Sequence, residues 1–196
     1  MTRILEVEKQ KTINCSKSTI LWNYWDHEHL THVHNGYDSS DILYETEKNL
    51  FRIDNLSIPL LFFIKFKTPI FMCQHDSNTI ITYAFHFGVL SKTKITIKSL
   101  SKTRTKIIMN YKFELNGWRK ILYPLLKIMI PKWNDQVWLE DLPLKKRREM
   151  VKNFGFKDFY GLPRNIKDRK KLKNNEFILP IVRPKKSIRD EHPFKE

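Results

Sequence analysis

Four of the seven histidines in this chain lie between His27 and His34. Neutral imidazole is the side chain that most often binds a metal ion near pH 7, so this clustering favours a metal site. His29 and His34 are separated by about 140° around an ideal helix. These two side chains can bind one ion only if a helix is distorted or ends between them, as a π-type turn would allow.

Several explanations of the cluster compete. The HExxH motif of zinc proteases does not fit, because Thr31 stands where the second histidine would be. A zinc site on His29 and His32, which would share a helix face, needs a further ligand from elsewhere in the chain. A polar loop with ordinary surface histidines needs no metal. The spacing Asp26-x2-His29-x4-His34 is the most specific feature of the segment.

The segment WNYWDHEHLTHVHNG, which begins at Trp22, resembles the mononuclear-iron motif of Rieske non-haem iron oxygenase alpha subunits. In that family the pattern is approximately E-N-Y-L-D-x-x-H-x-x-x-x-H-x-G. Trp22 and Trp25 depart from it, and His27 and His32 are additional. The positions that match are Asn23, Tyr24, Asp26, His29, His34 and Gly36.

The resemblance also implies a ligand set. The third ligand of the family is a carboxylate in a segment similar to E-D-x-x-I/L on the C-terminal helix, and WLEDLPL offers Asp141, with Glu140 as its rival. His29, His34 and Asp141 would then bind one mononuclear Fe²⁺ and leave positions open for O₂ and substrate. Asp26 would be a catalytic residue that hydrogen-bonds a ligand histidine and relays electrons.

By this resemblance the chain is an oxidoreductase, a monooxygenase or dioxygenase that hydroxylates a hydrophobic substrate. A Rieske cluster needs two Cys-His pairs. Cys73 and His75 offer one of these two pairs, and Cys15 offers none. Electrons would therefore come from a separate ferredoxin-like protein. Two alternatives stay open: a START-like module that binds a lipid, pigment or isoprenoid, and a zinc-dependent hydrolase or cyclase.

The order of elements predicts the fold. A strand is expected over residues 3–15, a helix from about Thr19 to Gly36, and a helix over residues 118–153 that Pro124 and Pro131 kink or divide. This order predicts an α+β helix-grip (START-like) fold, in which a curved antiparallel sheet of about seven strands wraps a long C-terminal helix. Alternating apolar residues predict strands over 41–47, 50–55, 60–67, 69–74, 79–90, 92–100 and 104–115.

Composition bounds the remaining expectations. We expect a helix-grip domain over residues 1–160 and a basic, largely extended or disordered tail over residues 161–196, within a chain of formal net charge +15. No nucleic-acid-binding motif is present, so we expect no nucleic-acid partner. The basic residues 145–148 are expected to form a solvated face. No apolar signal region and no disulfide framework are found, which predicts a cytoplasmic protein.

The charge also suits an acidic redox partner or an anionic membrane surface. Trp118, Arg119, Lys120 and Lys127 beside an apolar stripe agree with a peripheral membrane contact. The most apolar run, over residues 58–72, is too short and too charged to span a bilayer. The resemblance further implies a homo-trimer.

Overall fold

The structure is a computed structural model that describes residues 2–27, 29–34, 36–58 and 61–153. The basic tail expected over residues 161–196 lies outside this part of the chain, as does the end of the expected domain over residues 1–160.

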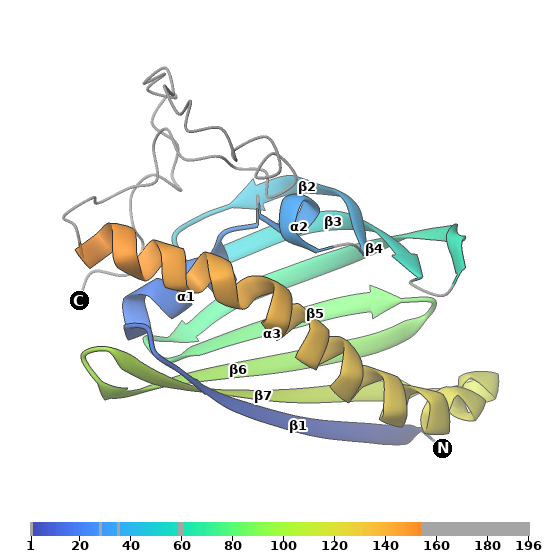
Figure 1. Ribbon diagram of the computed structural model, residues 1–196. Helices are drawn as coiled ribbons and strands as arrows, with labels where there is room; N and C mark the ends of the chain where they lie inside the picture. The colour runs from blue at the N-terminus through green and yellow to red at the C-terminus, as the bar shows by residue number, and fades with distance from the viewer. Residues whose placement is uncertain (1, 28, 35, 59–60, 154–196) are drawn as a thin grey trace.

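The chain forms one antiparallel sheet that curves around a long helix (Figure 1). The strand order is β1-β7-β6-β5-β4-β3-β2, so β2 to β7 form a meander and β1 joins beside β7. The predicted α+β helix-grip fold is therefore confirmed. The elements are β1 (Arg3–Ile13), α1 (Lys17–Trp25), α2 (Leu30–Val33), β2 (Tyr37–Glu45), β3 (Asn49–Ile58), β4 (Leu61–Asp76), β5 (Thr79–His86), β6 (Val89–Ser101), β7 (Arg104–Leu115), η1 (Gly117–Leu122) and α3 (Tyr123–Asn153).

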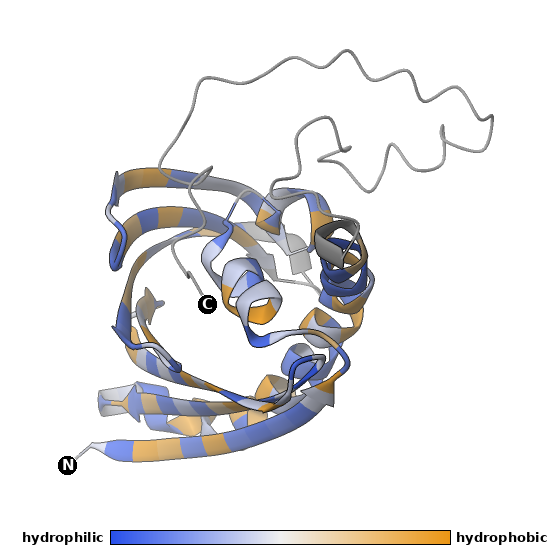
Figure 2. Ribbon diagram, turned by 90° about the vertical axis from the view of Figure 1, so that its left-hand side faces the viewer, coloured by the Kyte–Doolittle hydropathy of each residue, from blue (hydrophilic) through white to orange (hydrophobic). Residues whose placement is uncertain are grey.

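The buried side of the sheet follows the alternation of the sequence. Every second residue of β7, from Thr105 to Leu115, is buried, because successive side chains of a strand point to opposite faces. Figure 2 shows this alternation as orange and blue bands along strands that curl around the helices. The concave face therefore supplies one wall of the core.

Two strand boundaries differ from the sequence prediction. The strand expected over residues 79–90 ends at His86, because Phe87 and Gly88 both adopt positive φ angles, of 49° and 75°, and form a tight hairpin turn. The strands expected over residues 60–67 and 69–74 are one strand, β4. Pro69 is tolerated there because β4 pairs with β5 only from Ile70 onward.

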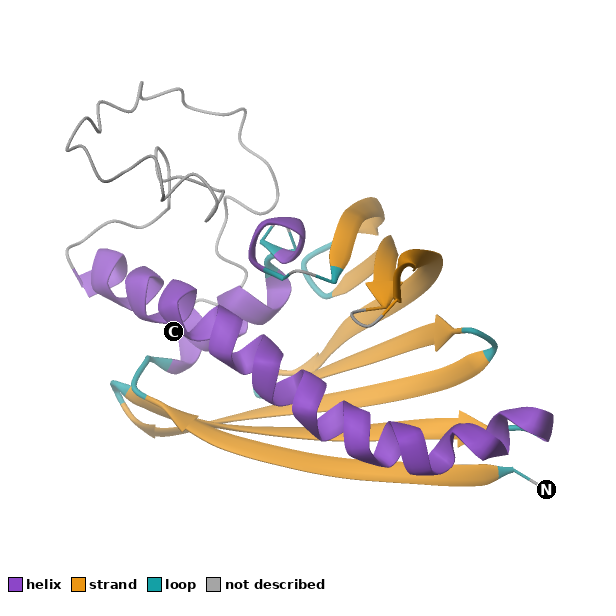
Figure 3. Cartoon of the chain, turned by 45° about the vertical axis from the view of Figure 1, so that its right-hand side comes forward, coloured by secondary structure: helices purple, strands orange, loops and turns teal. Residues whose placement is uncertain are grey.

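The C-terminal helix also differs from its prediction. Residues 117–122 form the 3-10 helix η1, and α3 runs without division from Tyr123 to Asn153, with Pro131 and Pro143 inside it. Pro124 lies in the first turn of α3, where a missing N–H costs no intrahelical bond. Figure 3 shows the helix crossing the open side of the sheet. A single rigid element thus spans the concave face.

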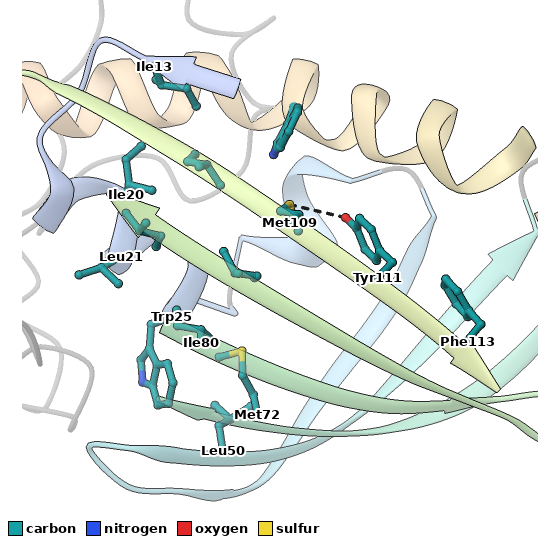
Figure 4. Close-up of a cluster of buried hydrophobic side chains, with 14 of the residues drawn as sticks. Ile13, Ile20, Leu21, Trp25, Leu50, Met72, Ile80, Met109, Tyr111 and Phe113 are labelled. Carbon is teal, nitrogen blue, oxygen red and sulfur yellow. Dashed lines mark hydrogen bonds between the residues drawn. The ribbon is translucent and has the colours of Figure 1, made fainter. Parts of the chain in front are cut away.

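The apolar core lies between the sheet, α1 and α3. Ile20, Leu21 and Trp25 of α1 are buried against residues from several strands, as Figure 4 shows. Met109 and Phe113 extend the same cluster along β7. α1 contacts both α3 and β6, and α2 lies against β2, so the segment that carries the histidines is held on two sides.

Candidate metal centre

The break between α1 and α2 places the histidines. Ser16 caps α1 by accepting a hydrogen bond from the backbone N–H of Thr19, and the helix ends at Trp25. α2 is a single turn, with His29 immediately before it and His34 immediately after it. The two imidazoles therefore come together at the ends of one short turn, with ring centroids 5.5 Å apart. The interrupted helix that their spacing requires is present.

His29 and His34, at the two ends of α2, meet Asp141 of α3. Asp141 Oδ1 lies 3.4 Å from His29 Nε2 and 3.2 Å from His34 Nε2. One ligand atom from each residue lies within 4.8 Å of the others. Ligands about 2.1 Å from a metal ion lie about 3 Å from one another, so small side-chain shifts would complete a site. All three side chains are buried.

The two oxygens of Asp141 have different surroundings. Oδ2 accepts hydrogen bonds from Lys145 Nζ at 2.9 Å and from Asn23 Nδ2 at 3.3 Å. Oδ1, the atom that faces both histidines, accepts no hydrogen bond within the described part of the chain. Burial acts to raise the pKa of Asp141, but the Lys145 ammonium and both histidines outweigh it and hold that pKa well below its usual range.

Glu140 acts on the far side of His34. Its Oε2 lies 2.7 Å from His34 Nδ1, and its Oε1 accepts a hydrogen bond from Gln136. Burial lowers the pKa of His34, but Asp141 and Glu140 together raise it above its ordinary value. Glu140 therefore orients the ring through the nitrogen that faces away from Asp141, as carboxylates around metal-binding histidines commonly do.

Asp26 does not make the hydrogen bond that the resemblance implied. Its Oδ2 lies 3.9 Å from His29 Nδ1, which is too long for a hydrogen bond. The same oxygen accepts a hydrogen bond from Arg148 Nη2, and Arg148 Nη1 donates to Asn23 Oδ1 at 3.2 Å. Asp26 thus joins a partly buried ion pair that links the end of α1 to α3.

The two additional histidines lie outside the three-residue group. The ring of His27 contacts Arg52 on β3, and Arg52 in turn pairs with Asp54 at 3.0 Å. His32 lies within α2 and is only partly buried. Neither joins His29 and His34 in the group that could hold a metal ion.

Two buried basic neighbours of this group were missed at the sequence level. Residues 145–148 were expected to form a solvated face, but Lys145 is fully buried and Arg148 nearly so. Lys145 follows Asp141 by one helical turn and therefore lies on the same face of α3. That spacing is the signal that could have identified it. Burial lowers the pKa of Lys145, but Tyr24 and Asp141 raise it above its ordinary value.

A second set of buried polar groups lies beside the first. Tyr111 on β7 donates a hydrogen bond to Asn134 Oδ1 on α3 at 2.5 Å. Asn134 is 1% exposed, and its Nδ2 donor has no hydrogen-bond partner among the described residues. Trp138 Nε1 donates to Tyr24 Oη at 3.1 Å. Burial raises the pKa of Tyr111 well above its ordinary value, so its hydroxyl keeps its proton.

Comparisons with known proteins establish the fold class. No family model matches the chain, and no curated protein matches its sequence. The Zhui aromatase/cyclase from Streptomyces sp. R1128 has a TM-score of 0.65 and 10% identity, over 74% of this chain and 96% of that chain. A START superfamily protein from Mycobacterium smegmatis has a TM-score of 0.55 and 16% identity, over 74% of this chain and 98% of that chain.

A third similar structure is norcoclaurine synthase from Thalictrum flavum in complex with dopamine and hydroxybenzaldehyde. Its TM-score is 0.55 and its identity 14%, over 74% of this chain and 88% of that chain. The oxidoreductase prediction is wrong: these neighbours are a cyclase, a START protein and a synthase, and none of the three is an oxygenase. The chain has the helix-grip fold of START-like proteins.

Proposed function

We propose that the chain binds an amphipathic small molecule between the concave face of the sheet and α3. The observation that carries this proposal is the buried Asn134, whose Nδ2 donor lacks a hydrogen-bond partner within the described residues. A buried unpaired donor costs about 1–3 kcal/mol, which an acceptor atom on a ligand would offset. The fold supports the proposal, since norcoclaurine synthase, which has a similar fold, forms a complex with dopamine and hydroxybenzaldehyde.

The surroundings of Asn134 define the chemistry of the ligand. Tyr111 holds the Asn134 side-chain amide by donating a hydrogen bond to its Oδ1. The Nδ2 donor of Asn134 is then left for an acceptor atom on a ligand. Met109 and Phe113 project from the same face of β7 as Tyr111 (Figure 4), and Ile130 of α3 packs against the same cluster. Apolar walls with a few oriented polar groups are typical of small-molecule sites. We infer a ligand with an apolar body and one hydroxyl or carbonyl oxygen.

The test uses two neutral probes. Nile red has an apolar body and a carbonyl acceptor, whereas pyrene has no acceptor. We expect saturable binding of both probes by fluorescence titration, and an apolar molecule in the organic extract of the natively purified protein. Asn134→Leu should weaken Nile red binding about fivefold, the usual effect of one hydrogen bond, and leave pyrene binding unchanged.

Gln136→Leu is the matched control, because Gln136 lies on the exposed side of the same helix. Its binding of both probes should equal that of the parent protein. If neither probe binds saturably and the organic extract of the native protein contains no apolar molecule, the proposal is overturned.

A second proposal is that His29, His34 and Asp141 bind one divalent metal ion. Its support is Asp141 Oδ1, which faces both imidazoles without a hydrogen bond while Lys145 and Asn23 hold the other oxygen. Two imidazoles and one carboxylate suit Fe²⁺, and zinc accepts the same donors. This proposal concerns metal binding alone.

Metal content measured by plasma mass spectrometry tests this second proposal. Protein purified anaerobically with Fe²⁺ should carry about one ion per chain, a stoichiometry typical of such sites. His29→Ala and Asp141→Ala should lose the ion, and His32→Ala should retain it. Equal metal content in the parent and all three variants would contradict the assignment, and metal-free parent protein would do the same.

A further inference from the structure

The outward side of η1 and of the first half of α3 exposes a run of large apolar side chains. Trp118 and Ile121 are 68% and 75% exposed, and Leu125 and Ile128 are 52% and 59% exposed. We call this surface the 118–133 face. Its large apolar members are Trp118, Ile121, Leu125, Ile128 and Met129, and Trp133 lies at its inner edge, where its ring contacts Tyr111 of β7.

These side chains are not the ones that the core uses. Tyr123, Leu126 and Ile130 turn inward and pack against the buried cluster. Leu125 and Ile128 lie on the other side of the same helical turns. The helix is therefore apolar on two sides in this half, and most of the second apolar side is exposed. A contiguous exposed apolar surface of this kind commonly marks an interaction site.

The charges on the 118–133 face have one sign. Arg119, Lys120, Lys127 and Lys132 lie between residues 115 and 134, and no Asp or Glu is present there. The next acid along the chain, Asp135, already pairs with Lys9 at 2.8 Å. The face therefore presents four positive charges among its apolar side chains.

The face continues onto the sheet. Arg119 Nε donates a hydrogen bond to the backbone oxygen of Phe87 at 2.8 Å, and the Arg119 guanidinium stacks on the Trp118 ring. Phe87, in the turn between β5 and β6, is 52% exposed. Arg119 thus joins the exposed Trp118 of η1 to the backbone of the β5–β6 turn, in which Phe87 is also exposed.

We propose that the 118–133 face docks on an anionic lipid bilayer. Helices that lie in the membrane interface combine Trp, Leu or Ile with Lys and Arg in this way. Anionic headgroups would neutralise the four basic residues, and the apolar side chains would enter the boundary with the acyl chains. No helix of the described residues is long and apolar enough to cross a membrane, so contact through this face would be peripheral.

A second copy of the chain fits the face poorly. Two such faces would bring the four basic residues of each copy together, and neither copy supplies an acid between residues 115 and 134. A lipid surface offers both the negative charge and the apolar layer. The proposal is independent of the ligand and metal proposals, because it uses the outer side of α3 only.

Sedimentation with vesicles tests the proposal. The full chain is mixed with vesicles of phosphatidylcholine alone or with about 30% phosphatidylglycerol, a fraction high enough to give a marked negative surface potential. Two variants alter the face: Trp118→Ser with Ile121→Ser and Ile128→Ser, and Lys127→Glu with Lys132→Glu. Lys98→Glu with Lys102→Glu makes the same charge change near the β6–β7 hairpin, at the opposite end of β7.

We expect the parent protein to sediment with the anionic vesicles and hardly at all with phosphatidylcholine alone. Both face variants should bind at least fivefold more weakly, and the hairpin control should stay within twofold of the parent. Circular dichroism and thermal melting identify any variant that has not folded, and the single substitutions Ile121→Ser and Lys127→Glu then replace it.

An equal loss of vesicle binding in the hairpin control, or undiminished binding in both face variants, would overturn the proposal. A dimer in gel filtration that the apolar variant converts to monomer, with no vesicle binding, would assign the face to a second copy instead.

Discussion

At the scale of single residues, the candidate metal centre depends on which groups compensate the negative charge of Asp141. Lys145 and Asn23 hold one carboxylate oxygen, and the other faces the imidazoles of His29 and His34. A buried carboxylate without a counter-charge is strongly unfavourable. Lys145 therefore supplies the positive charge in the absence of a metal ion, and a bound ion would share that role.

Replacement of Lys145 by methionine should make the stability of the protein depend on metal. Lys145→Met keeps most of the side-chain volume but leaves Asp141 without its ammonium partner. The free energy of unfolding in EDTA should fall by about 3–5 kcal/mol. Zn²⁺ or Fe²⁺ should recover more stability in this variant than in the parent, as measured by urea unfolding.

Lys146→Met is the control for this prediction, since Lys146 is exposed on the next position of α3. It should unfold like the parent protein with and without metal. A Lys145→Met variant that is as stable as the parent in EDTA would show that Asp141 does not need this partner.

The motif resemblance selected His29, His34 and Asp141, and the structure brings these three side chains together. Their binding of a metal ion stays a prediction. Asn134 and Lys145 could not be selected in the same way, because their importance lies in being buried on one side of α3. An isolated asparagine or a lysine within a basic run looks like a surface residue until the packing of the helix is known.

At the scale of elements, the turn between β5 and β6 holds two parts of the fold together. Gly88 adopts a φ of 75°, and a Cβ built on it would overlap the Arg119 guanidinium. Arg119 in turn ties η1 to the turn through Phe87. The glycine thus allows a close approach as well as a backbone conformation that other residues rarely adopt.

Gly88→Ala should therefore destabilise the protein by about 1–3 kcal/mol, the usual range for backbone strain. Urea unfolding monitored by circular dichroism measures the change. Gly36→Ala is the matched control, because a Cβ there meets only Ser57 O at 3.8 Å, and it should change the free energy of unfolding by less than about 0.5 kcal/mol. Equal effects of the two substitutions would exclude the strain at Gly88.

Most of the sheet could be predicted because one face of each strand is buried, and this burial produces a visible alternation of apolar and polar residues along the sequence. The errors occur where contacts with other elements, rather than the local sequence, decide the outcome. The sequence predicted a gap at residue 68, before Pro69, yet β4 continues through it, and Pro69 is tolerated because its β5 side is still unpaired there. Pro131 looked like a division of the C-terminal helix, yet α3 passes through it. Packing of α3 against β1 and α1 stabilises the helix beyond its local preference.

At the scale of the whole molecule, the two cysteines differ in their access to solvent. Cys15 is fully buried where β1 meets α1, and its backbone oxygen accepts a hydrogen bond from Thr105 Oγ1 on β7. Burial, with a smaller contribution from Glu149, raises the pKa of the Cys15 thiol to about 11. Cys73 is only partly buried. One thiol therefore belongs to the core and the other does not.

Thiol labelling at pH 8 should separate the two cysteines. Cys73 should react with a maleimide in the native protein, whereas Cys15 should react only as fast as the whole domain unfolds, because only the thiolate is nucleophilic. In Cys73→Ser the fast phase should disappear. Rapid reaction of both cysteines in the parent protein would show that the junction of β1 and α1 opens without global unfolding.

The pairing of β1 with β7 has a consequence for synthesis on the ribosome. Arg3 lies opposite Leu115, so the first strand made must wait for the last strand before its hydrogen bonds can form. At typical elongation rates of about 5–20 residues per second, that delay is on the order of 5–20 s. During this time the apolar residues of β1 are without their final partners. The nascent chain is therefore a natural client for chaperones, and truncation of α3, which packs on β1, would prolong that exposure.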